Sequence, residues 1–491
     1  MIVNYEYQNG HLILSYIDQK GDLKIKNYGW QNPTEWQPCS ADDPEKSDRY
    51  HTWDRKPVKR VNVRWPNRYS IAEFLTNLPE SEQQEIFAYN EPKIFFCDIE
   101  VEIIDGFPEA HLANSPITAI CICHNNIINL LGIKDLEQAK VQKMQNDINQ
   151  YFKKYDTNYK LKWYYYDTEK EMIETFFNDI VPKIPVLTGW NFVNYDWVYF
   201  VTRARKLGIN PNVASPTGKL VRPWKKNQSE ERPTFEELPK HRLVFDYLDI
   251  FAKWDTSIKI KESDKLDFVA KQVLDLPKLE YEGTLKDLYH KDWYKYLLYN
   301  CIDTLLVQQI HLKQRTFDLM LSLSNLAKIE IEQSMSAIRV TEGIFAKPYK
   351  DVGIVLCRQK PQIGIEEVEE IETEDGNTGG YVKYPAVGLH SWVTVFDFAS
   401  LYPTTMRQFN IGPETFKGIR ISDREALLNG TKHPIEEGDI ILLNGAVFSK
   451  QDGQTKRVIT DIFGDRKKNK GVSLDHKKQS ALLKDYLKTR I

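Results

Sequence analysis

Two acidic residues inside a dense apolar strand constrain the fold of this chain most. Asp98 and Glu100 lie in the stretch FFCDIEVE, whose pattern indicates a buried strand. Residues i and i+2 of a strand point to the same side of a sheet, so both carboxylates leave one face. A buried charge is costly unless it is paired or binds a metal. The pattern therefore indicates either a salt-bridged pair or part of a metal site.

The same strand opens an alternation of strands and helices. After about residue 92, the strand-like runs TAICICH, LKWYYYD and VLTGW alternate with the helix-like runs NDINQYFKKY, MIETFFNDIV and WYKYLLYNCIDTLLVQQIHLKQ. Such alternation is typical of α/β domains. Residues 1–90 instead predict short strands separated by polar turns. A polar insert at 222–240 is either a projecting hairpin, with GKLV and RLVF as its strands, or a plain surface loop.

Composition sets broad limits on the class of protein. A length of 491 residues predicts several domains. The net charge of -3 does not indicate a nucleic-acid binder, but residues 454–491 carry eleven Lys or Arg against four acids and form a basic, largely helix-like tail. Six cysteines without framework spacing indicate a reducing compartment. The chain shows no signal peptide and no apolar run of about 20 residues, so we expect a cytoplasmic protein without a membrane span.

Two further motifs carry acidic residues in the α/β region. Asp196 follows a strand in TGWNFVNYD, where a helix can start. Tyr299 and Asp303 lie four residues apart in YNCID, so they share a face of a predicted helix. Each motif alone fits a capping or surface role. Four carboxylates together suit Mg²⁺ or Mn²⁺ rather than zinc, and two such ions can stabilise both oxygens of a phosphodiester displacement.

In order and spacing, these motifs resemble the three motifs of the 3′–5′ proofreading exonuclease of family B DNA polymerases. The phrases DGFPEA and LTGWN resemble the T-even phage type in particular. The resemblance implies an RNase H-like exonuclease that acts on a single-stranded DNA 3′ end with two Mg²⁺ or Mn²⁺ ions. It implies that Tyr299 orients the attacking water and that Lys278 lies near the scissile phosphate, although a surface position is the default for a lysine. The implied metal ligands are Asp98, Glu100, Asp196 and Asp303.

A fifth acid lies in a separate motif. Asp397 sits inside an apolar, strand-like run in FDFASLYPTTMRQFN, and this stretch resembles DxxSLYP, the first polymerase motif of the family. The resemblance implies that Asp397 and the backbone carbonyl of Phe398 bind Mg²⁺. It also implies that the amides of Ser400, Leu401 and Tyr402 line the triphosphate of a dNTP, as backbone amides around a tight turn can. The ring of Tyr402 would leave no room for a 2′-hydroxyl.

The basic tail contains another matching segment. VITDIFGDRKKNKG resembles the first fingers helix of the family. Arg466 and Lys470 are four residues apart, so they share a helical face. The resemblance implies that this face grips the β- and γ-phosphates of the dNTP; the alternative is a basic solvated helix. Gly379, Gly380 and Tyr381 resemble the glycine–tyrosine element that links the exonuclease and polymerase regions.

Two motifs that the family needs do not occur between residues 404 and 491. One is a second fingers helix of the KxxxNSxYG kind, and the other is a palm turn of the YxDTDS kind with the second metal-binding aspartate. We therefore expect the amino-terminal half of a polymerase, either a natural split subunit or a fragment, and favour the split. A second polypeptide would carry the rest of the fingers, palm and thumb, and a sliding clamp would bind through that partner.

Two functional hypotheses follow. The first is DNA synthesis on primer-template DNA together with that partner, with the exonuclease complete in this chain and acting in a bacterial host cytoplasm. The second is a catalytically silent DNA- or RNA-binding or scaffold module that retains the fold. The expected fold is α/β multidomain, with an RNase H-like exonuclease inserted after a mixed β-rich N-terminal domain and followed by a partial α+β palm and partial helical fingers. The expected domains are 1–92 plus about 317–368 (N-terminal), 93–316 (exonuclease), 369–453 (palm) and 454–491 (fingers).

Overall fold

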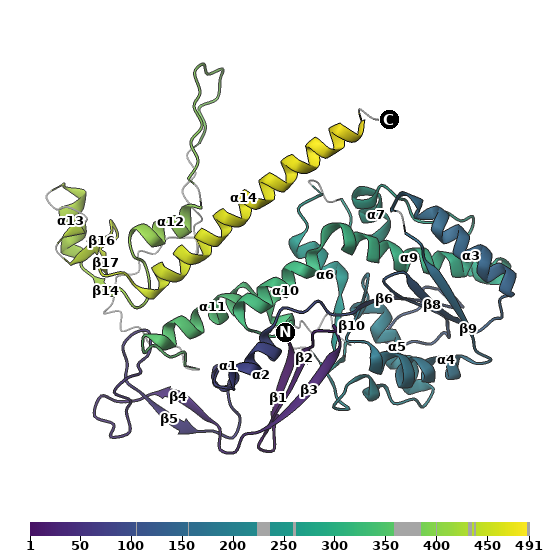
Figure 1. Cartoon of the computed structure of the whole chain (residues 1–491), viewed down its shortest axis with the longest axis horizontal. Coiled ribbons are helices and arrows are strands. Elements are labelled where there is room, and N and C mark those ends of the chain that lie inside the picture. The colour runs from purple at the N-terminus through teal and green to yellow at the C-terminus, as the bar shows by residue number, and fades with distance from the viewer. Residues whose placement is uncertain are drawn as a thin grey trace. The chain divides into compact units, whose positions relative to one another are not determined.

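The chain forms two compact units (Figure 1). Its computed structural model describes residues 1–104, 106–155, 157–222, 236–258, 262–357, 384–398, 400–430, 435–436 and 438–488, with only the backbone described for 422–425, 435–436 and 474–488. Unit 1 consists of Met1–Pro33 and Ile71–Ile344, and unit 2 consists of Thr34–Ser70 and Phe345–Ile491. None of the described helices is both long and apolar enough to cross a membrane.

Unit 1 begins with a three-stranded antiparallel sheet. β1 (Ile2–Gln8), β2 (His11–Ile17) and β3 (Leu23–Gly29) pair in sequence order, so the short strands predicted for this region form. The buried side chains of β2 pack against α1 (Arg68–Thr76) and α2 (Glu80–Phe87) in a small core of their own.

A six-stranded mixed sheet forms the centre of unit 1. Its strand order is β13-β10-β6-β7-β8-β9. β7 is antiparallel to β6 and to β8, whereas the β6–β10, β10–β13 and β8–β9 pairs are parallel. The α/β alternation predicted after residue 92 is thus observed. The strands are β6 (Ile94–Val101), β7 (Ile117–His124), β8 (Ile127–Gly132), β9 (Lys160–Tyr165), β10 (Val186–Gly189) and β13 (Leu243–Asp246).

Helices cover both faces of this sheet (Figure 1). On one side lie α3, α7 and α9, and on the other α4 and α5. The helices of unit 1 after α2 are α3 (Gln138–Tyr151), α4 (Glu169–Thr175), α5 (Val198–Lys206), α6 (Tyr247–Trp254), α7 (Leu266–Leu274), α8 (Leu285–Lys291), α9 (Trp293–Gln314) and α10 (Thr316–Ala327). Short 3-10 or π turns occur at η1 (Lys153–Tyr155), η2 (Phe176–Ile180), η3 (Val181–Lys183), η4 (Val193–Trp197), η5 (Pro211–Ala214) and η6 (Glu332–Met335).

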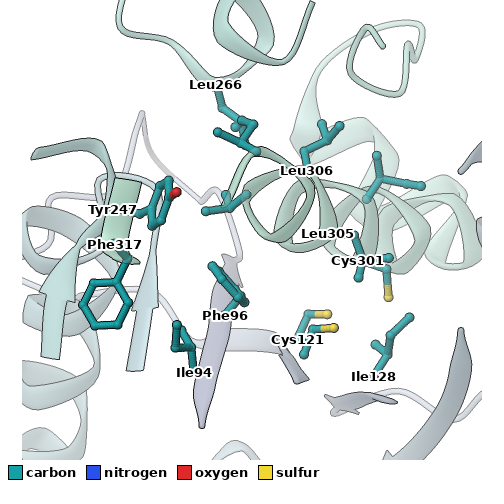
Figure 2. Close-up of a cluster of buried hydrophobic side chains, with 14 of the residues drawn as sticks. Ile94, Phe96, Cys121, Ile128, Tyr247, Leu266, Cys301, Leu305, Leu306 and Phe317 are labelled. Carbon is teal, nitrogen blue, oxygen red and sulfur yellow. The ribbon is translucent and has the colours of Figure 1, made fainter. Parts of the chain in front are cut away.

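The strand β6 divides its side chains between two cores. Ile94 and Phe96 belong to the core beneath α9, which also contains Cys121 and Cys301 (Figure 2). The odd-numbered positions, such as Ile99, belong to the core beneath α4 and α5. Because side chains of a strand alternate between faces, the even positions 98 and 100 fall on the side of α9.

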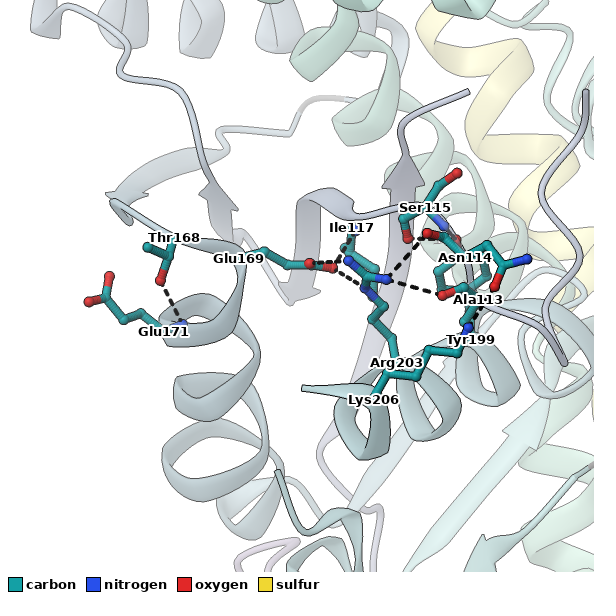
Figure 3. A network of polar contacts seen from close by, with 10 residues as sticks. All are labelled: Ala113, Asn114, Ser115, Ile117, Thr168, Glu169, Glu171, Tyr199, Arg203 and Lys206. Atoms are coloured by element: carbon teal, nitrogen blue, oxygen red, sulfur yellow. Dashed lines mark hydrogen bonds and ion pairs between the residues drawn. The ribbon is translucent and has the colours of Figure 1, made fainter. Parts of the chain in front are cut away.

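A network of polar contacts, here called the clamp, holds the connection after β6 against α4 and α5 (Figure 3). The Arg203 guanidinium on α5 donates two parallel hydrogen bonds to the Glu169 carboxylate at 2.8 and 2.7 Å, and a third at 3.2 Å to the Ala113 carbonyl. Glu169, at the start of α4, also accepts from the Ile117 amide at 2.7 Å. Tyr199 donates to the Ser115 carbonyl at 2.7 Å. The clamp thus ties residues 113–117 to α4 and to α5.

Unit 2 combines a hairpin, a small antiparallel sheet and helices. The hairpin pairs β4 (Thr34–Pro38) with β5 (Val58–Asn62). The sheet has the order β14-β17-β16-β15, with β14 (Phe416–Ile419), β15 (Ile435–Glu436), β16 (Asp439–Ile441) and β17 (Ala446–Ser449). The helices are the end of α11 (Ala337–Asp351), which begins in unit 1, and α12 (Leu401–Gln408), α13 (Ile421–Leu428) and α14 (Gln454–Lys488). The helix predicted in the basic tail is α14.

The structure corrects two predictions. The run before SLYP is not a strand: residues 393–398 have no regular structure, and Phe396 and Phe398 are 89% and 75% exposed. An alternating run becomes a strand only where a neighbour takes up its backbone hydrogen bonds, and no described strand pairs with it. At the insert, β11 (Leu220–Val221) pairs with β12 (Leu238–Pro239), whereas RLVF forms most of β13 in the central sheet. Most of the insert, 223–235, lies outside the described residues.

Candidate functional site

β6 presents both of its acids toward α9. Glu100 is buried and Asp98 is partly buried. The amide nitrogen of Asn300, on α9, donates to Asp98 Oδ2 at 2.7 Å. The two carboxylates therefore lie on the side of the sheet that α9 covers, and they share one face as the i, i+2 spacing predicts.

Asp196 reaches the same place from the end of β10. The chain leaves β10 through a tight turn and enters the π-helical turn η4, which carries Asp196. Asp196 is buried, and its Oδ1 accepts a hydrogen bond from the Ile99 amide at 3.0 Å. Its carboxylate thus lies against the backbone that joins Asp98 to Glu100. Gly189 permits this close packing, because a Cβ there would lie 2.3 Å from the Cys97 carbonyl oxygen.

α9 supplies Tyr299 and Asp303, and the segment between α7 and α8 supplies Lys278. The Lys278 ammonium donates to the Tyr299 hydroxyl at 3.1 Å and forms an ion pair with the Asp303 carboxylate. Tyr299 and Asp303 therefore share a helical face, as their spacing predicts. Lys278 lies within this cluster with its side chain 26% exposed, so a plain surface position is wrong for it. The structure thus brings Asp98, Glu100, Asp196, Tyr299, Asp303 and Lys278 together.

Burial raises the pKa of all four carboxylates, and the charges of neighbouring acids add to the rise. Burial, and then the charge of Asp303, raises the pKa of Asp98 to about 7 against the opposing effect of Lys278. Burial and Asp98 raise the pKa of Glu100 and of Asp196 well above the usual range. Burial raises the pKa of Asp303 although Lys278 opposes it. Without a bound cation, the site therefore disfavours its own full negative charge.

This donor set fits a hard divalent cation. Carboxylate oxygens are the ligands that Mg²⁺ and Mn²⁺ prefer. Asp303 Oδ1 is buried and has no hydrogen-bond partner among the described residues, so it is available as a ligand. A bound cation would also relieve the repulsion between the carboxylates. Over the described part of the chain, no three or more His, Cys, Asp or Glu side chains are already grouped closely enough to hold a metal ion.

Three further residues belong to this region and were not predicted. Asn300 binds Asp98, and Asp246 accepts hydrogen bonds from the turn that leads to Asp196. Asp246 carried a usable signal, since it is an acid at the end of the apolar run RLVFD. Phe107 is 75% exposed, with its ring centroid 5.5 Å from that of Tyr195. Such an exposed aromatic pair gives no periodic signal in a sequence.

The second predicted constellation lies in unit 2. Ser400 precedes α12 with left-handed backbone angles (φ 54°, ψ 59°), so the chain turns sharply into the helix. The Arg466 guanidinium, on α14, donates to the Ser400 hydroxyl at 2.8 Å. Lys470 follows Arg466 by about one turn on the same helix and is exposed. The structure thus brings together one predicted residue from the SLYP motif and one from the basic helix.

The other residues of this constellation are open to solvent. Asp397 and Phe398 lie in the irregular segment before α12, and Leu401 and Tyr402 are 49% and 79% exposed in its first turn. Because Asp397 is exposed, burial gives no reason for it to need a metal. Gly379, Gly380 and Tyr381 lie outside the described residues. α12 and α14 are in contact, with the Arg407 guanidinium donating to the Thr460 hydroxyl at 3.1 Å. A cavity of about 460 Å³ lies beside this contact, lined by Thr404, Arg407, Gln408, Asp452, Lys456, Arg457, Thr460 and Asp461.

Comparison with known families decides the identity of the chain. Residues 58–269 match the model of the DNA polymerase family B exonuclease domain, and residues 336–488 match the model of DNA polymerase family B. The chain belongs to DNA polymerase family B. The order of the two matches agrees with the order of the motifs, with the exonuclease region before the polymerase region. Domains of this family generally use divalent metals, in line with the acidic site above.

Individual relatives include phage polymerases. A DNA-directed DNA polymerase of Escherichia phage RB69 is 27% identical over 435 residues, which are 84% of this chain and 46% of that protein. One from Enterobacteria phage T4 is 27% identical over 309 residues, 62% of this chain and 33% of that protein. A DNA polymerase of Archaeoglobus fulgidus is 28% identical over 253 residues, 50% of this chain and 29% of that protein. This family B chain therefore spans less than half the length of these relatives.

Proposed function

We propose that this chain is a 3′–5′ exonuclease acting on single-stranded DNA, and that it supplies half of a site for template-directed DNA synthesis. The convergence of four carboxylates from β6, η4 and α9 beside the Tyr299 hydroxyl carries the proposal. The names of the phage relatives support DNA synthesis, and their source supports action in a bacterial host cytoplasm.

The central sheet supports an RNase H-like exonuclease. Five of its strands follow the order β8-β7-β6-β10-β13, and within these five only β7 runs against the others. The acids lie on strand β6, on the turn η4 that follows β10, and on α9, which packs on this face of the sheet. We retain the proposed division into an N-terminal domain (1–92 plus about 317–368), an exonuclease (93–316), a partial palm (369–453) and partial fingers (454–491).

The proposed reaction is hydrolysis of the last phosphodiester. Two Mg²⁺ or Mn²⁺ ions held by Asp98, Glu100, Asp196 and Asp303 would stabilise the attacking and leaving oxygens. Burial and the charges of Asp303 and Glu100 raise the pKa of Tyr299, so its hydroxyl keeps its proton and can orient the water. The water oxygen bonds to phosphorus and the bond to the 3′ oxygen breaks, which releases a 5′-mononucleotide and leaves a new 3′-hydroxyl.

Other groups near the cluster suit the DNA strand. The Lys278 ammonium lies where it can balance the charge of the reacting phosphate, beside Tyr299 and Asp303. The exposed ring of Phe107, next to that of Tyr195, offers a surface on which an unpaired base can stack. The stacking contact favours single-stranded over paired DNA ends, because a paired base is not free to stack on the ring.

The carboxylate cluster is tested with the double variant Asp98→Ala, Glu100→Ala. We expect the wild-type chain to shorten 5′-labelled single-stranded DNA with Mg²⁺, and the double variant to lose at least about 10³-fold in rate, because two of the four proposed metal ligands are removed. Glu102→Ala, just after the end of β6, is the matched control. Unchanged hydrolysis by the double variant would refute the site assignment.

DNA synthesis by this chain requires groups from elsewhere. By the motif match, Asp397 and the Phe398 carbonyl would bind Mg²⁺, the amides of Ser400, Leu401 and Tyr402 would line the dNTP, and Arg466 and Lys470 would grip its phosphates. The hydrogen bond from Arg466 to Ser400 supports this grouping. We propose that a second polypeptide supplies the second carboxylate and the remaining fingers, palm and thumb, and that a sliding clamp binds through it.

The same labelled-DNA assay tests this arrangement with a primer-template and dNTPs. The single chain should shorten the primer but not extend it, and addition of a polypeptide that carries the two missing motifs should restore extension. Extension by residues 1–491 alone would refute the division of the site. If the chain binds single-stranded DNA but neither hydrolyses nor, with the partner, extends it, the silent binding module is the correct function.

A further inference from the structure

Asp246 lies where the central sheet meets the turn that carries Asp196. It ends β13 opposite Gly189, the last residue of the neighbouring parallel strand β10, and it caps the start of α6. Its side chain is 3% exposed, so it is enclosed by protein although it belongs to none of the motifs above. The Thr188 hydroxyl donates to the Phe245 carbonyl at 2.9 Å and fixes the two strand ends together.

The Asp246 carboxylate spans the whole connection between β10 and η4. Its Oδ1 accepts from the Asn191 amide at 3.0 Å, and its Oδ2 accepts from the Val193 amide at 3.3 Å and from the Asn194 side chain at 3.5 Å. The same Oδ1 accepts from the Leu248 amide at 3.0 Å at the helix start. One buried carboxylate thus connects β13 and α6 to three of the four residues at 191–194, just before Asp196.

The backbone around residues 191–194, which Asp246 holds, is also constrained at two other points. Asn191 has a positive φ of 58°, a conformation that few residues adopt without support. Asp196 follows two residues after Asn194, and its own carboxylate is held on the other side by the Ile99 amide. The position of the Asp196 carboxylate against β6 therefore depends on a turn whose amides are held by Asp246.

We propose that Asp246 is a positioning residue of the exonuclease: it fixes the turn at 191–194 so that Asp196 meets the cation site at the correct place. The inference rests on the proposed exonuclease function. Asp246 touches neither DNA nor the reacting atoms, and it acts only through Asp196. Groups that orient the ligands of a metal typically change metal affinity or activity by about 10- to 100-fold when they are replaced.

The test replaces Asp246 by asparagine, which has the same shape but offers an NH₂ group to one side of the turn. Calorimetric titration of the DNA-free chain with Mn²⁺ should show an affinity about 10- to 100-fold weaker than wild type. The turnover number on single-stranded DNA at fixed Mn²⁺ should fall in parallel, and raised Mn²⁺ should restore part of it. The KM for DNA should stay unchanged, because no group that contacts DNA is altered.

Two further variants keep the experiment decisive. Asp249→Asn removes an exposed acid from the first turn of the same helix α6 and should leave Mn²⁺ affinity at the wild-type level. Asn194→Ala removes an exposed donor to Asp246 and should weaken Mn²⁺ binding in the same direction, by less. If circular dichroism shows that Asp246→Asn does not fold, Asn194→Ala decides the outcome.

The failure of this inference is separable from the failure of the proposed function. If the wild-type chain binds Mn²⁺ and hydrolyses DNA but Asp246→Asn matches it in both, Asp246 is not a positioning residue. If Asp246→Asn does not fold and Asn194→Ala binds Mn²⁺ with wild-type affinity, Asp246 is again not a positioning residue. If the wild-type chain neither binds Mn²⁺ nor hydrolyses DNA and resembles the Asp98, Glu100 double variant, the exonuclease proposal itself is wrong.

Discussion

At the scale of single residues, His241 shows how burial changes the charge state of a side chain. Its ring is 1% exposed, with Nδ1 3.1 Å from the Ser15 hydroxyl and Nε2 3.7 Å from the Glu6 carboxylate. Burial, followed by the charge of Lys240, lowers the pKa of His241 to about 4, although Glu6 opposes the shift. His311 is a second such residue, since burial and Arg315 lower its pKa to about 4.

These two residues predict acid sensitivity. An unfolded histidine titrates near 6.5, so between pH 6.5 and 4 the unfolded chain binds protons that the folded chain does not. The stabilisation is fully present above pH 6.5 and is lost as the pH falls, by about 1.4 kcal/mol per unit and per residue. His241→Gln should remove the contribution of this residue to the pH dependence of the free energy of unfolding. That contribution is about 3 kcal/mol between pH 6.5 and 4. Urea unfolding of unit 1 at several pH values measures this slope; exposed His11→Gln is the control, and an equal change in both variants would contradict the prediction.

The residues of the exonuclease cluster differ in how visible they are in a sequence. Asp98 and Glu100 are conspicuous because charges inside an apolar strand need a partner. Asp196 and Asp303 were proposed as ligands only from the combination of motifs and the resemblance that it carries. Asn300 could not be predicted. A polar residue in a mostly buried helix looks the same in a sequence whether it holds a metal ligand or only forms an internal hydrogen bond. Asp246 lies at the end of an apolar run, but no recognised motif surrounds it.

At the scale of elements, the clamp of Figure 3 joins α4 and α5 to the connection after β6. The side chains of Arg203 and Glu169 are 15% and 10% exposed, and the guanidinium binds both carboxylate oxygens through two parallel hydrogen bonds. Arg203→Met should lower the free energy of unfolding by about 3–5 kcal/mol, because it leaves the Glu169 charge buried without its partner. Arg205→Met, on the same helix, removes an ion pair between Arg205 and Glu237. Because Arg205 is 48% exposed, this change should lower the free energy of unfolding by less than about 1 kcal/mol.

Urea unfolding of the two variants measures this difference. Equal losses for Arg203→Met and Arg205→Met would contradict the clamp as a stabilising element. Arg203→Lys should fall between wild type and Arg203→Met, because lysine keeps the charge but cannot form the two parallel hydrogen bonds.

Elements were predictable where local pattern and packing agree. The long helix expected at residues 293–314 is α9 with the same bounds, because its apolar positions continue for six turns and it lies in the core beneath the sheet. The run before SLYP is also apolar and strand-like but forms no strand, since pairing depends on a neighbour that local sequence does not specify. RLVF likewise has strand character, yet only the tertiary fold decides that it joins β10 rather than the hairpin.

At the scale of the whole molecule, the small net charge conceals an uneven distribution of charge along the chain. The chain carries a formal charge of -3, which would repel DNA, whereas residues 454–491 have a net charge of +7. On α14, Lys467, Lys468 and Lys470 are exposed. A compact group of exposed cations attracts the phosphates of DNA irrespective of the net charge of the protein. We therefore expect α14, rather than the molecule as a whole, to determine how salt affects DNA binding.

Replacement of these three lysines by glutamine tests that expectation. Each phosphate contact contributes about 0.9 to the slope of log affinity against log salt, so the triple variant should lower the slope by up to about 2.7 on duplex DNA. Fluorescence anisotropy with a labelled primer-template at increasing salt measures the slope. Lys140, Lys143 and Lys153, exposed in unit 1, form a matched triple whose replacement changes the net charge equally. If both triples lower the slope by the same amount, total charge and not α14 governs the attraction of DNA.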